Sequence, residues 1–133
     1  MTATSFFFAH NTETRIPDGV HKWTSIRFGV DKFETGAVLT KLKLSLSVRT
    51  KHRGDLQIIL EGPSGYQALV HNEEGAGKDN LILKDIDFTE DFADIEANGY
   101  WYLRIQDRLK GDAAVLKSAV LEVSTDEVSA PTP

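Results

Sequence analysis

The sequence predicts an all-β domain, a β-sandwich of the jelly-roll type, on three observations. Apolar and polar side chains alternate with a period of two in several short segments, as in strands with one buried face. Turn-forming Gly, Pro, Asp and Asn residues separate these segments. No segment carries the apolar stripe of an amphipathic helix. Many short strands joined by glycine-rich turns are typical of sandwiches.

The strand pattern is clearest from Leu42 to Val48, where four apolar residues alternate with Lys and Ser. The same alternation recurs in four other segments: Ile26–Val30, Leu56–Leu60, Trp101–Ile105 and Leu116–Val123. The stretch Asp85–Ala97 is rich in Asp and Glu and is the least strand-like part of the chain. It is therefore predicted to be a long acidic loop, with room for a helical turn.

The predicted domain boundary lies near the end of the chain. Residues 1–123 are expected to form the sandwich, and residues 124–133 a linker-like tail that is polar and ends in Ala-Pro-Thr-Pro. The first ten residues have no basic region and a single short apolar block, Phe6–Phe8, which is not the pattern of a signal peptide. We therefore expect either an intracellular protein or a domain of a longer precursor.

Composition excludes several classes of function. The chain has 133 residues, 41% of them hydrophobic, which is enough for one domain with a sizeable core. A net charge of −5 argues against nucleic acid as a partner, because nucleic-acid affinity comes from clustered Lys and Arg. No apolar run approaches the ~20 residues of a membrane span. The absence of cysteine excludes disulfides and thiolate metal sites.

Four short motifs occur in the order and spacing of a known family. They are Ile16-Pro17-Asp18, His52-Arg53-Gly54-Asp55-Leu56, Gly62-Pro63-Ser64-Gly65, and Asn98–Asp107 followed by Gly111-Asp112. Together they resemble the P domain (P/Homo B domain, the proprotein convertase P-domain) of subtilisin/kexin-like serine proteases, over about Ile16 to Val123. The resemblance implies a galactose-binding-domain-like jelly roll.

The same resemblance implies an accessory domain with no catalytic residues of its own. It would stabilise a subtilisin-like catalytic domain, in the same or another chain, or adjust its calcium and pH response. It also implies a secreted or cell-surface location. One departure is that Ala114, Leu116 and Ala119 stand where the family usually has Gly-x-Leu and then Trp. Other side chains, such as Phe6–Phe8, are expected to fill the missing volume.

Seven motif residues are expected to have structural roles: Gly54, Asp55, Pro63, Gly65, Gly99, Trp101 and Asp107. Gly54 and Gly65 stand where the chain turns into or out of a strand, and such sites often need a positive φ. Asp55 precedes a strand and is expected to cap the turn through its side chain. Trp101 is in phase with the apolar residues of its strand, so it is expected to fill the core.

No catalytic residues are predicted. His52, Asp55 and Ser64 supply the side chains of a hydrolase triad, but they lie in the family motifs and in no nucleophile elbow. The adhesion tripeptide Arg53-Gly54-Asp55 has the same structural explanation.

Calcium is the one cofactor that the sequence leaves open. Four aspartates lie in or beside turns, where they serve either Asx turns or calcium: Asp18, Asp79, Asp107 and Asp112. No spacing matches an EF-hand, so turn formation is the favoured interpretation and no metal ligand is assigned.

The outer face of the Trp101 strand is the predicted functional surface. If Trp101 points inward, Tyr100, Tyr102, Arg104 and Gln106 all point outward. These four are interface candidates, because Tyr and Arg anchor protein interfaces. The alternative is that Tyr102 packs under a loop or neighbouring strand.

A second hypothesis is a binding module for carbohydrate or protein, freestanding or appended to another enzyme. Jelly-roll domains that bind sugars use exposed aromatic side chains, and this chain offers Trp23, Tyr66, Tyr100 and Tyr102.

Overall fold

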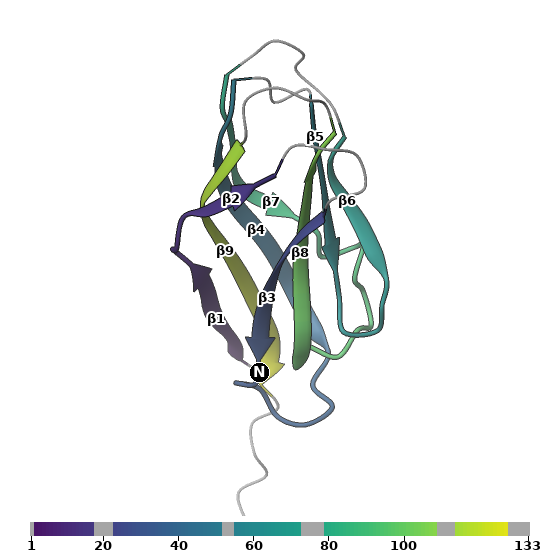
Figure 1. Cartoon of the computed structure of the whole chain (residues 1–133). Helices are drawn as coiled ribbons and strands as arrows, with labels where there is room; N and C mark the ends of the chain where they lie inside the picture. The colour runs from purple at the N-terminus through teal and green to yellow at the C-terminus, as the bar shows by residue number, and fades with distance from the viewer. Residues whose placement is uncertain (1, 18–22, 52–54, 73–78, 109–113, 128–133) are drawn as a thin grey trace, which may run out of the picture.

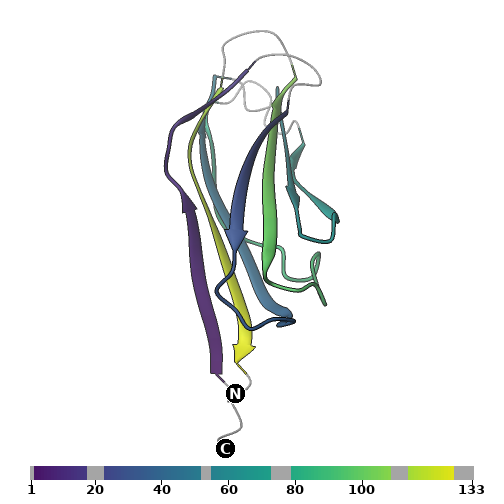
Figure 2. The same cartoon turned by 60° about the horizontal axis from the view of Figure 1, so that its bottom comes forward.

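The computed structural model describes residues 2–17, 23–51, 55–72, 79–108 and 114–127. Within these ranges the chain forms two antiparallel sheets that pack face to face, as Figures 1 and 2 show. The predicted all-β sandwich is confirmed. Among the described residues no helix is long and apolar enough to cross a membrane.

The five-stranded sheet has the order β1–β9–β4–β7, with β2 also paired to β9. Its strands are β1 (Thr2–His10), β2 (Thr14–Ile16), β4 (Leu39–Arg49), β7 (Leu81–Asp87) and β9 (Ala114–Glu127). The four-stranded sheet has the order β3–β8–β5–β6. Its strands are β3 (Trp23–Val30), β5 (Leu56–Glu61), β6 (Gln67–Asn72) and β8 (Gly99–Asp107).

The core lies between the sheets and is built by the predicted alternation. On β4 the inward residues Leu42, Leu44, Leu46 and Val48 are buried, and β8 buries Trp101 among its inward residues. Phe92, from the loop between β7 and β8, packs edge-on against Trp101 with ring centroids 5.1 Å apart. The acidic loop therefore supplies an apolar anchor to the core.

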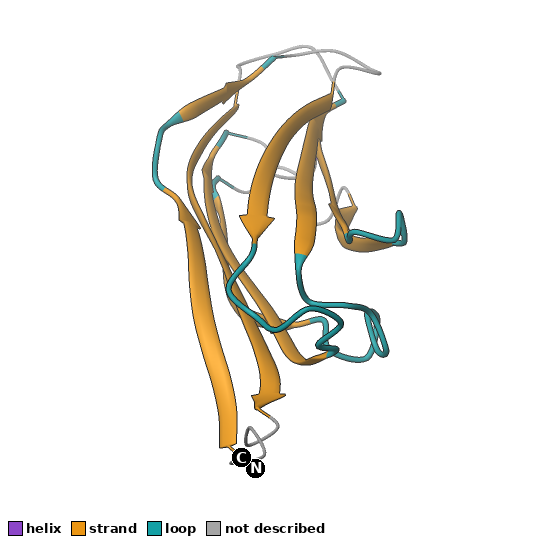
Figure 3. Cartoon of the chain, turned by 90° about the horizontal axis from the view of Figure 1, so that it is seen from below, coloured by secondary structure: helices purple, strands orange, loops and turns teal. Residues whose placement is uncertain are grey.

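Two long loops join at one end of the sandwich (Figure 3). The side chain of Asn98 accepts a hydrogen bond from the backbone N–H of Phe33 at 3.1 Å and donates one to its carbonyl at 2.8 Å. The N–H of Ala97 donates to the carbonyl of Ala37 at 2.8 Å. These bonds hold the loop after β3 against the loop before β8.

Two predicted boundaries need correction, and the N-terminal segment takes a structure that the sequence left open. Strand β9 continues to Glu127 and buries Ser124 and Thr125, so the predicted tail at 124–133 begins too early. Residues 128–133 lie outside the described part. The stretch predicted as a loop from Asp85 begins inside β7, which ends at Asp87. The N-terminal segment is strand β1, which pairs with β9 from Thr2 to His10.

Phe6 and Phe8 face inward, whereas Phe7 is 67% exposed on the outer face. The ring of Phe6 meets Phe33 edge-on at 5.4 Å, and Phe8 packs against the core. Two of the three phenylalanines therefore contribute apolar volume to the inside of the sandwich.

Candidate functional site

The outer face of the four-stranded sheet gathers most of the predicted interface residues. Trp101, Leu103 and Ile105 of β8 are fully buried, so the residues between them lie on the opposite face. Tyr100 is 54% exposed there, and Tyr102 and Arg104 are half-buried. The alternation of β8 thus places these three side chains as predicted.

Gln106 is the exception, because it is 3% exposed. It lies in the middle of the sheet, directly opposite Trp23 on β3 and Gln57 on β5. Two long side chains on the same face therefore flank it, and strand alternation alone does not report such lateral cover. Gln106 therefore lies on the predicted face but is covered there, and it is not exposed as an interface residue was expected to be.

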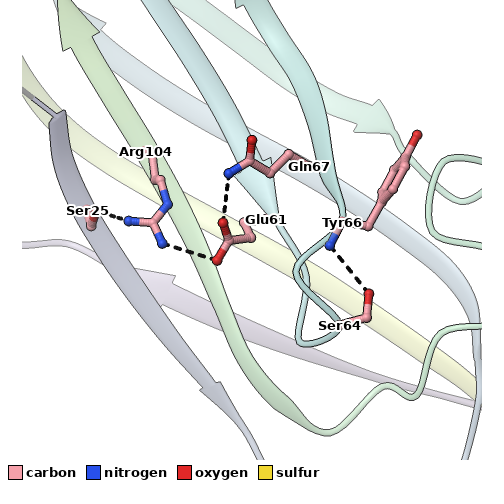
Figure 4. A network of polar contacts seen from close by, with 6 residues as sticks. All are labelled: Ser25, Glu61, Ser64, Tyr66, Gln67 and Arg104. Atoms are coloured by element: carbon pink, nitrogen blue, oxygen red, sulfur yellow. Dashed lines mark hydrogen bonds and ion pairs between the residues drawn. The ribbon is translucent and has the colours of Figure 1, made fainter. Parts of the chain in front are cut away.

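A polar network crosses this face around Arg104 (Figure 4). One guanidinium nitrogen donates to Ser25 of β3 at 2.7 Å, and another donates to the Glu61 carboxylate of β5 at 3.1 Å. The second oxygen of Glu61 accepts a 2.8 Å hydrogen bond from the Gln67 amide of β6. The hydrogen bonds from Gln67 and then Arg104 hold the pKa of Glu61 below its ordinary value. The network ties all four strands together.

Two arginines stack on the two tyrosines of β8. The guanidinium carbon of Arg104 lies 4.9 Å from the ring centroid of Tyr102, and that of Arg27 lies 4.7 Å from Tyr100. Arg27 is on β3, opposite Tyr102 in register. At these distances the ring electrons attract the cation. Both arginines are therefore held in place on the sheet surface.

Hollows of moderate size open beside these side chains. One, of about 360 Å³, is lined by Trp23, Ile59, Glu61, Gln67 and Arg104. The exposed Leu69 of β6 lies opposite Ile59 and extends the apolar side of this region. A surface that combines Trp, Tyr, Arg and aliphatic side chains has the composition of a protein-binding site.

Of the predicted structural residues, Trp101 lies in the core as expected. Trp101 is fully buried, and its indole N–H donates a 3.0 Å hydrogen bond to the carbonyl of Ala97. Gly65 has φ +93° and Gly99 has φ +134°, and Gly99 lies against Pro63. The carbonyl of Asp55 accepts a 2.8 Å bond from the N–H of Arg108.

Of the other residues considered in the sequence, several lie outside the described ranges. Gly54, His52, Asp18 and Asp112 lie outside the described residues. Asp79 is exposed just before β7, whereas Asp107 is buried at the end of β8. In the described ranges no three His, Cys, Asp or Glu side chains cluster in a way that could hold a metal ion.

Comparison with known families shows which family the chain belongs to. The sequence model of the proprotein convertase P-domain family matches residues 39–123, which run from the start of β4 into β9. The chain belongs to the proprotein convertase P-domain family. The P-domain match includes β4, β5, β6, β7 and β8, and so includes Glu61, Tyr102 and Arg104 of the outer face.

Two curated relatives are similar to most of this chain. The chain is 28% identical over 111 residues to leupeptin-inactivating enzyme 1 of Streptomyces exfoliatus, with 84% of the chain aligned. It is also 28% identical over 109 residues to the transglutaminase-activating metalloprotease of Streptomyces mobaraensis, with 82% aligned. The chain spans only 24% and 14% of these relatives' lengths.

Solved structures share the fold at low sequence identity. A serine protease of Aeromonas sobria superposes with a TM-score of 0.68 at 16% identity, covering 95% of this chain and 28% of that one. FLHE superposes with a TM-score of 0.62 at 11% identity, covering 96% of this chain and 100% of that one. At these identities the likeness concerns the architecture alone.

Proposed function

We propose that this chain is a non-catalytic accessory P domain of a subtilisin-like serine endopeptidase, and that it stabilises or regulates the catalytic domain. The observation that carries the proposal is the family match over residues 39–123. The partner is a catalytic domain in the same or another chain, in a secreted or cell-surface protein. A serine protease of Aeromonas sobria has the same architecture in 28% of its chain, so the fold does occur within a serine protease.

The surface proposed to meet the catalytic domain is the outer face of the four-stranded sheet. Tyr100, Trp23 and Leu69 are exposed there, and two stacked arginines lie between them. Aromatic side chains lose little conformational freedom when a partner covers them, and an arginine that is already held by stacking loses less than a free one. The opposite sheet exposes Phe7, Ile82 and Ile86 instead, and its described residues include no arginine stacked on an aromatic ring.

The test compares the protease that carries this domain with the same protease lacking it. We expect removal of the domain to lower the melting temperature of the catalytic domain and shorten its active lifetime. Tyr100→Ser should have a similar but smaller effect, whereas Phe7→Ser, which changes an exposed ring on the other sheet, should not. Melting of each isolated variant domain shows whether it still folds. A protease that is equally stable with and without the domain would contradict the proposal.

A second candidate partner is a metalloprotease catalytic domain. The observation that favours it is the name of the second relative, which is 28% identical over 82% of this chain. The two classes separate by inhibition: phenylmethylsulfonyl fluoride inactivates a serine protease, and 1,10-phenanthroline removes zinc from a metalloprotease.

Carbohydrate binding remains the alternative outside the proteases. Sugars stack on open ring faces, whereas Arg27 and Arg104 each cover a face of a tyrosine, and Tyr66 meets Phe92 edge-on at 5.4 Å. This arrangement favours a protein partner. Binding to any polysaccharide on a glycan array, abolished by Trp23→Ala, would reverse that preference.

A further inference from the structure

Arg27 presents an exposed cation with no carboxylate partner among the described residues. Its guanidinium carbon lies 4.7 Å from the centroid of the Tyr100 ring, and this is its one side-chain interaction in that part of the chain. Stacking on an aromatic ring leaves the N–H groups at the edge of the guanidinium free to donate hydrogen bonds. Arg27 therefore offers a pre-positioned fork of donors on the outer face.

The Glu61 carboxylate on the same face bonds to Gln67 and Arg104 and not to Arg27. Both oxygens of Glu61 accept hydrogen bonds, one from Gln67 and one from Arg104. Arg104 in turn also donates to Ser25. The centre of the face thus carries two guanidinium groups and one carboxylate, whose bonds go to Gln67 and Arg104. The net charge at the centre of the face is therefore positive, although the whole chain carries a net charge of −5.

A hollow of about 390 Å³ opens beside Tyr100, the ring on which Arg27 stacks. It is lined by Gly29, Val30, Asp31, Gly99 and Tyr100. Two of these residues are glycines, and a Cβ built on Gly29 would lie 3.7 Å from the Tyr100 ring. The absence of a side chain at Gly29 therefore leaves space next to the exposed face of the sheet, within reach of a partner's side chain.

We propose that Arg27, stacked on Tyr100, binds a carboxylate side chain of the catalytic domain, whose aliphatic part enters the hollow beside Gly29. A planar guanidinium and a carboxylate form two parallel charge-assisted hydrogen bonds. The positive surplus of the face makes an acidic segment the complementary partner. Asp31 also lines the hollow and repels a carboxylate inside it, so only the aliphatic part of the partner's side chain is expected to enter. The identity of the partner rests on the function proposed above; the carboxylate chemistry rests on Arg27.

The first experiment titrates the ¹⁵N-labelled domain with the peptide acetyl-Gly-Glu-Gly-Glu-Gly-amide and, as a control, with its Gln counterpart. We expect the Glu peptide to shift the Arg27 Nε–H and Tyr100 signals in a saturable manner that weakens with added salt. The Gln peptide should not. Arg27→Gln should remove the response, and Arg27→Lys should weaken it about tenfold, since an ammonium lacks the planar fork. Arg49→Gln, which removes an exposed arginine from the other sheet, should leave it unchanged.

A second variant fills the hollow and keeps the charge. Gly29 does not have a positive φ, and a Cβ there makes only an ordinary contact, so Gly29→Val should fold normally in its strand. We expect it to weaken the response to the Glu peptide. An unchanged response in folded Arg27→Gln, or equal responses to the Glu and Gln peptides, overturns the proposal.

Measuring the active lifetime of the protease that carries the domain distinguishes failure of this inference from failure of the proposed function. If Arg27→Gln shortens its active lifetime and Arg49→Gln does not, the carboxylate belongs to the catalytic domain. If loss of the whole domain has no effect, the proposed function fails, and the peptide titration alone decides the carboxylate site. Self-association of the domain that Arg27→Gln abolishes would assign the carboxylate to a second copy and overturn the choice of partner.

Discussion

Gly99 and Pro63 lie in direct contact, although they belong to two motifs 36 positions apart. A Cβ built on Gly99 would lie 2.7 Å from the Cβ and 2.9 Å from the Cγ of Pro63. Gly99 also has φ +134°, which side chains other than glycine rarely adopt. The contact fixes the start of β8 against the turn that connects β5 to β6.

Gly99→Ala should therefore destabilise the domain by about 2–4 kcal/mol, through backbone strain and overpacking together. Urea unfolding followed by circular dichroism measures the change. Gly65→Ala is the matched control, because Gly65 has φ +93° but no atom within 4 Å of the added Cβ. It should cost about 1–2 kcal/mol from strain alone.

A double-mutant cycle with Pro63→Gly isolates the contact between the two residues. If the Cβ of Pro63 causes the overpacking, Gly99→Ala should cost less in the Pro63→Gly background. Equal costs in both backgrounds would assign the whole effect to the positive φ of Gly99.

Trp101 is predicted to contribute the largest single share of core stability. It is fully buried, packs against Phe92, and donates its indole N–H to Ala97. Trp101→Ala should cost about 3–5 kcal/mol in urea unfolding. Trp101→Phe keeps an aromatic ring but leaves the Ala97 carbonyl without its donor, and should cost less, about 1–3 kcal/mol. A loss below about 1 kcal/mol for the alanine variant would contradict the central position of Trp101.

The sequence predicted the sandwich because alternation is a local property of each strand. Leu42–Val48 and Trp101–Ile105 follow it without interruption. The ends of the chain were predicted less well. Phe6–Phe8 lie in a strand paired with β9, and Ser124 and Thr125 are buried by strands distant in sequence. Their polar or short apolar segments carry no local pattern that reports this pairing.

The same limit explains what was missed in the candidate site. Tyr100, Tyr102 and Arg104 follow from the period of a single strand, whereas Arg27 and Glu61 reach them across strand pairs. Nothing in the β3 sequence specifies that Arg27 lies opposite Tyr102. Burial of Gln106 likewise depends on its neighbours in the sheet, Trp23 and Gln57. Register between distant strands is the information that one sequence lacks.

Calcium binding stays a prediction, and the structure narrows the residues to test. No three His, Cys, Asp or Glu side chains of the described ranges could hold a metal ion together, so Asp18 and Asp112, the two predicted aspartates outside those ranges, are the first residues to test. We expect any rise in melting temperature with calcium, measured against chelator, to disappear in Asp18→Asn or Asp112→Asn. A rise that survives both substitutions would place the site elsewhere.

The Glu61–Arg104 pair should make stability depend on pH in a defined direction. Hydrogen bonds from Gln67 and Arg104 lower the pKa of Glu61 in the folded protein below its ordinary value of 4.5. Between the folded and unfolded pKa values the unfolded chain binds more protons, so acid favours unfolding. The stabilisation is thus complete above about pH 4.5 and is lost as the pH falls through the folded pKa.

Glu61→Gln removes this contribution, which should be at most about 1 kcal/mol because the pair lies at the surface. The difference in unfolding free energy between the native protein and Glu61→Gln should therefore be constant near neutral pH and shrink below about pH 4.5. Glu13 and Asp87 also have lowered pKa values. Both proteins contain them, so their contributions to the pH dependence cancel in the difference. Glu90→Gln, at an exposed position in the loop before β8, provides the control. A difference that grows on acidification would contradict the engagement of Glu61, and with it the argument that Arg27 has no carboxylate of its own.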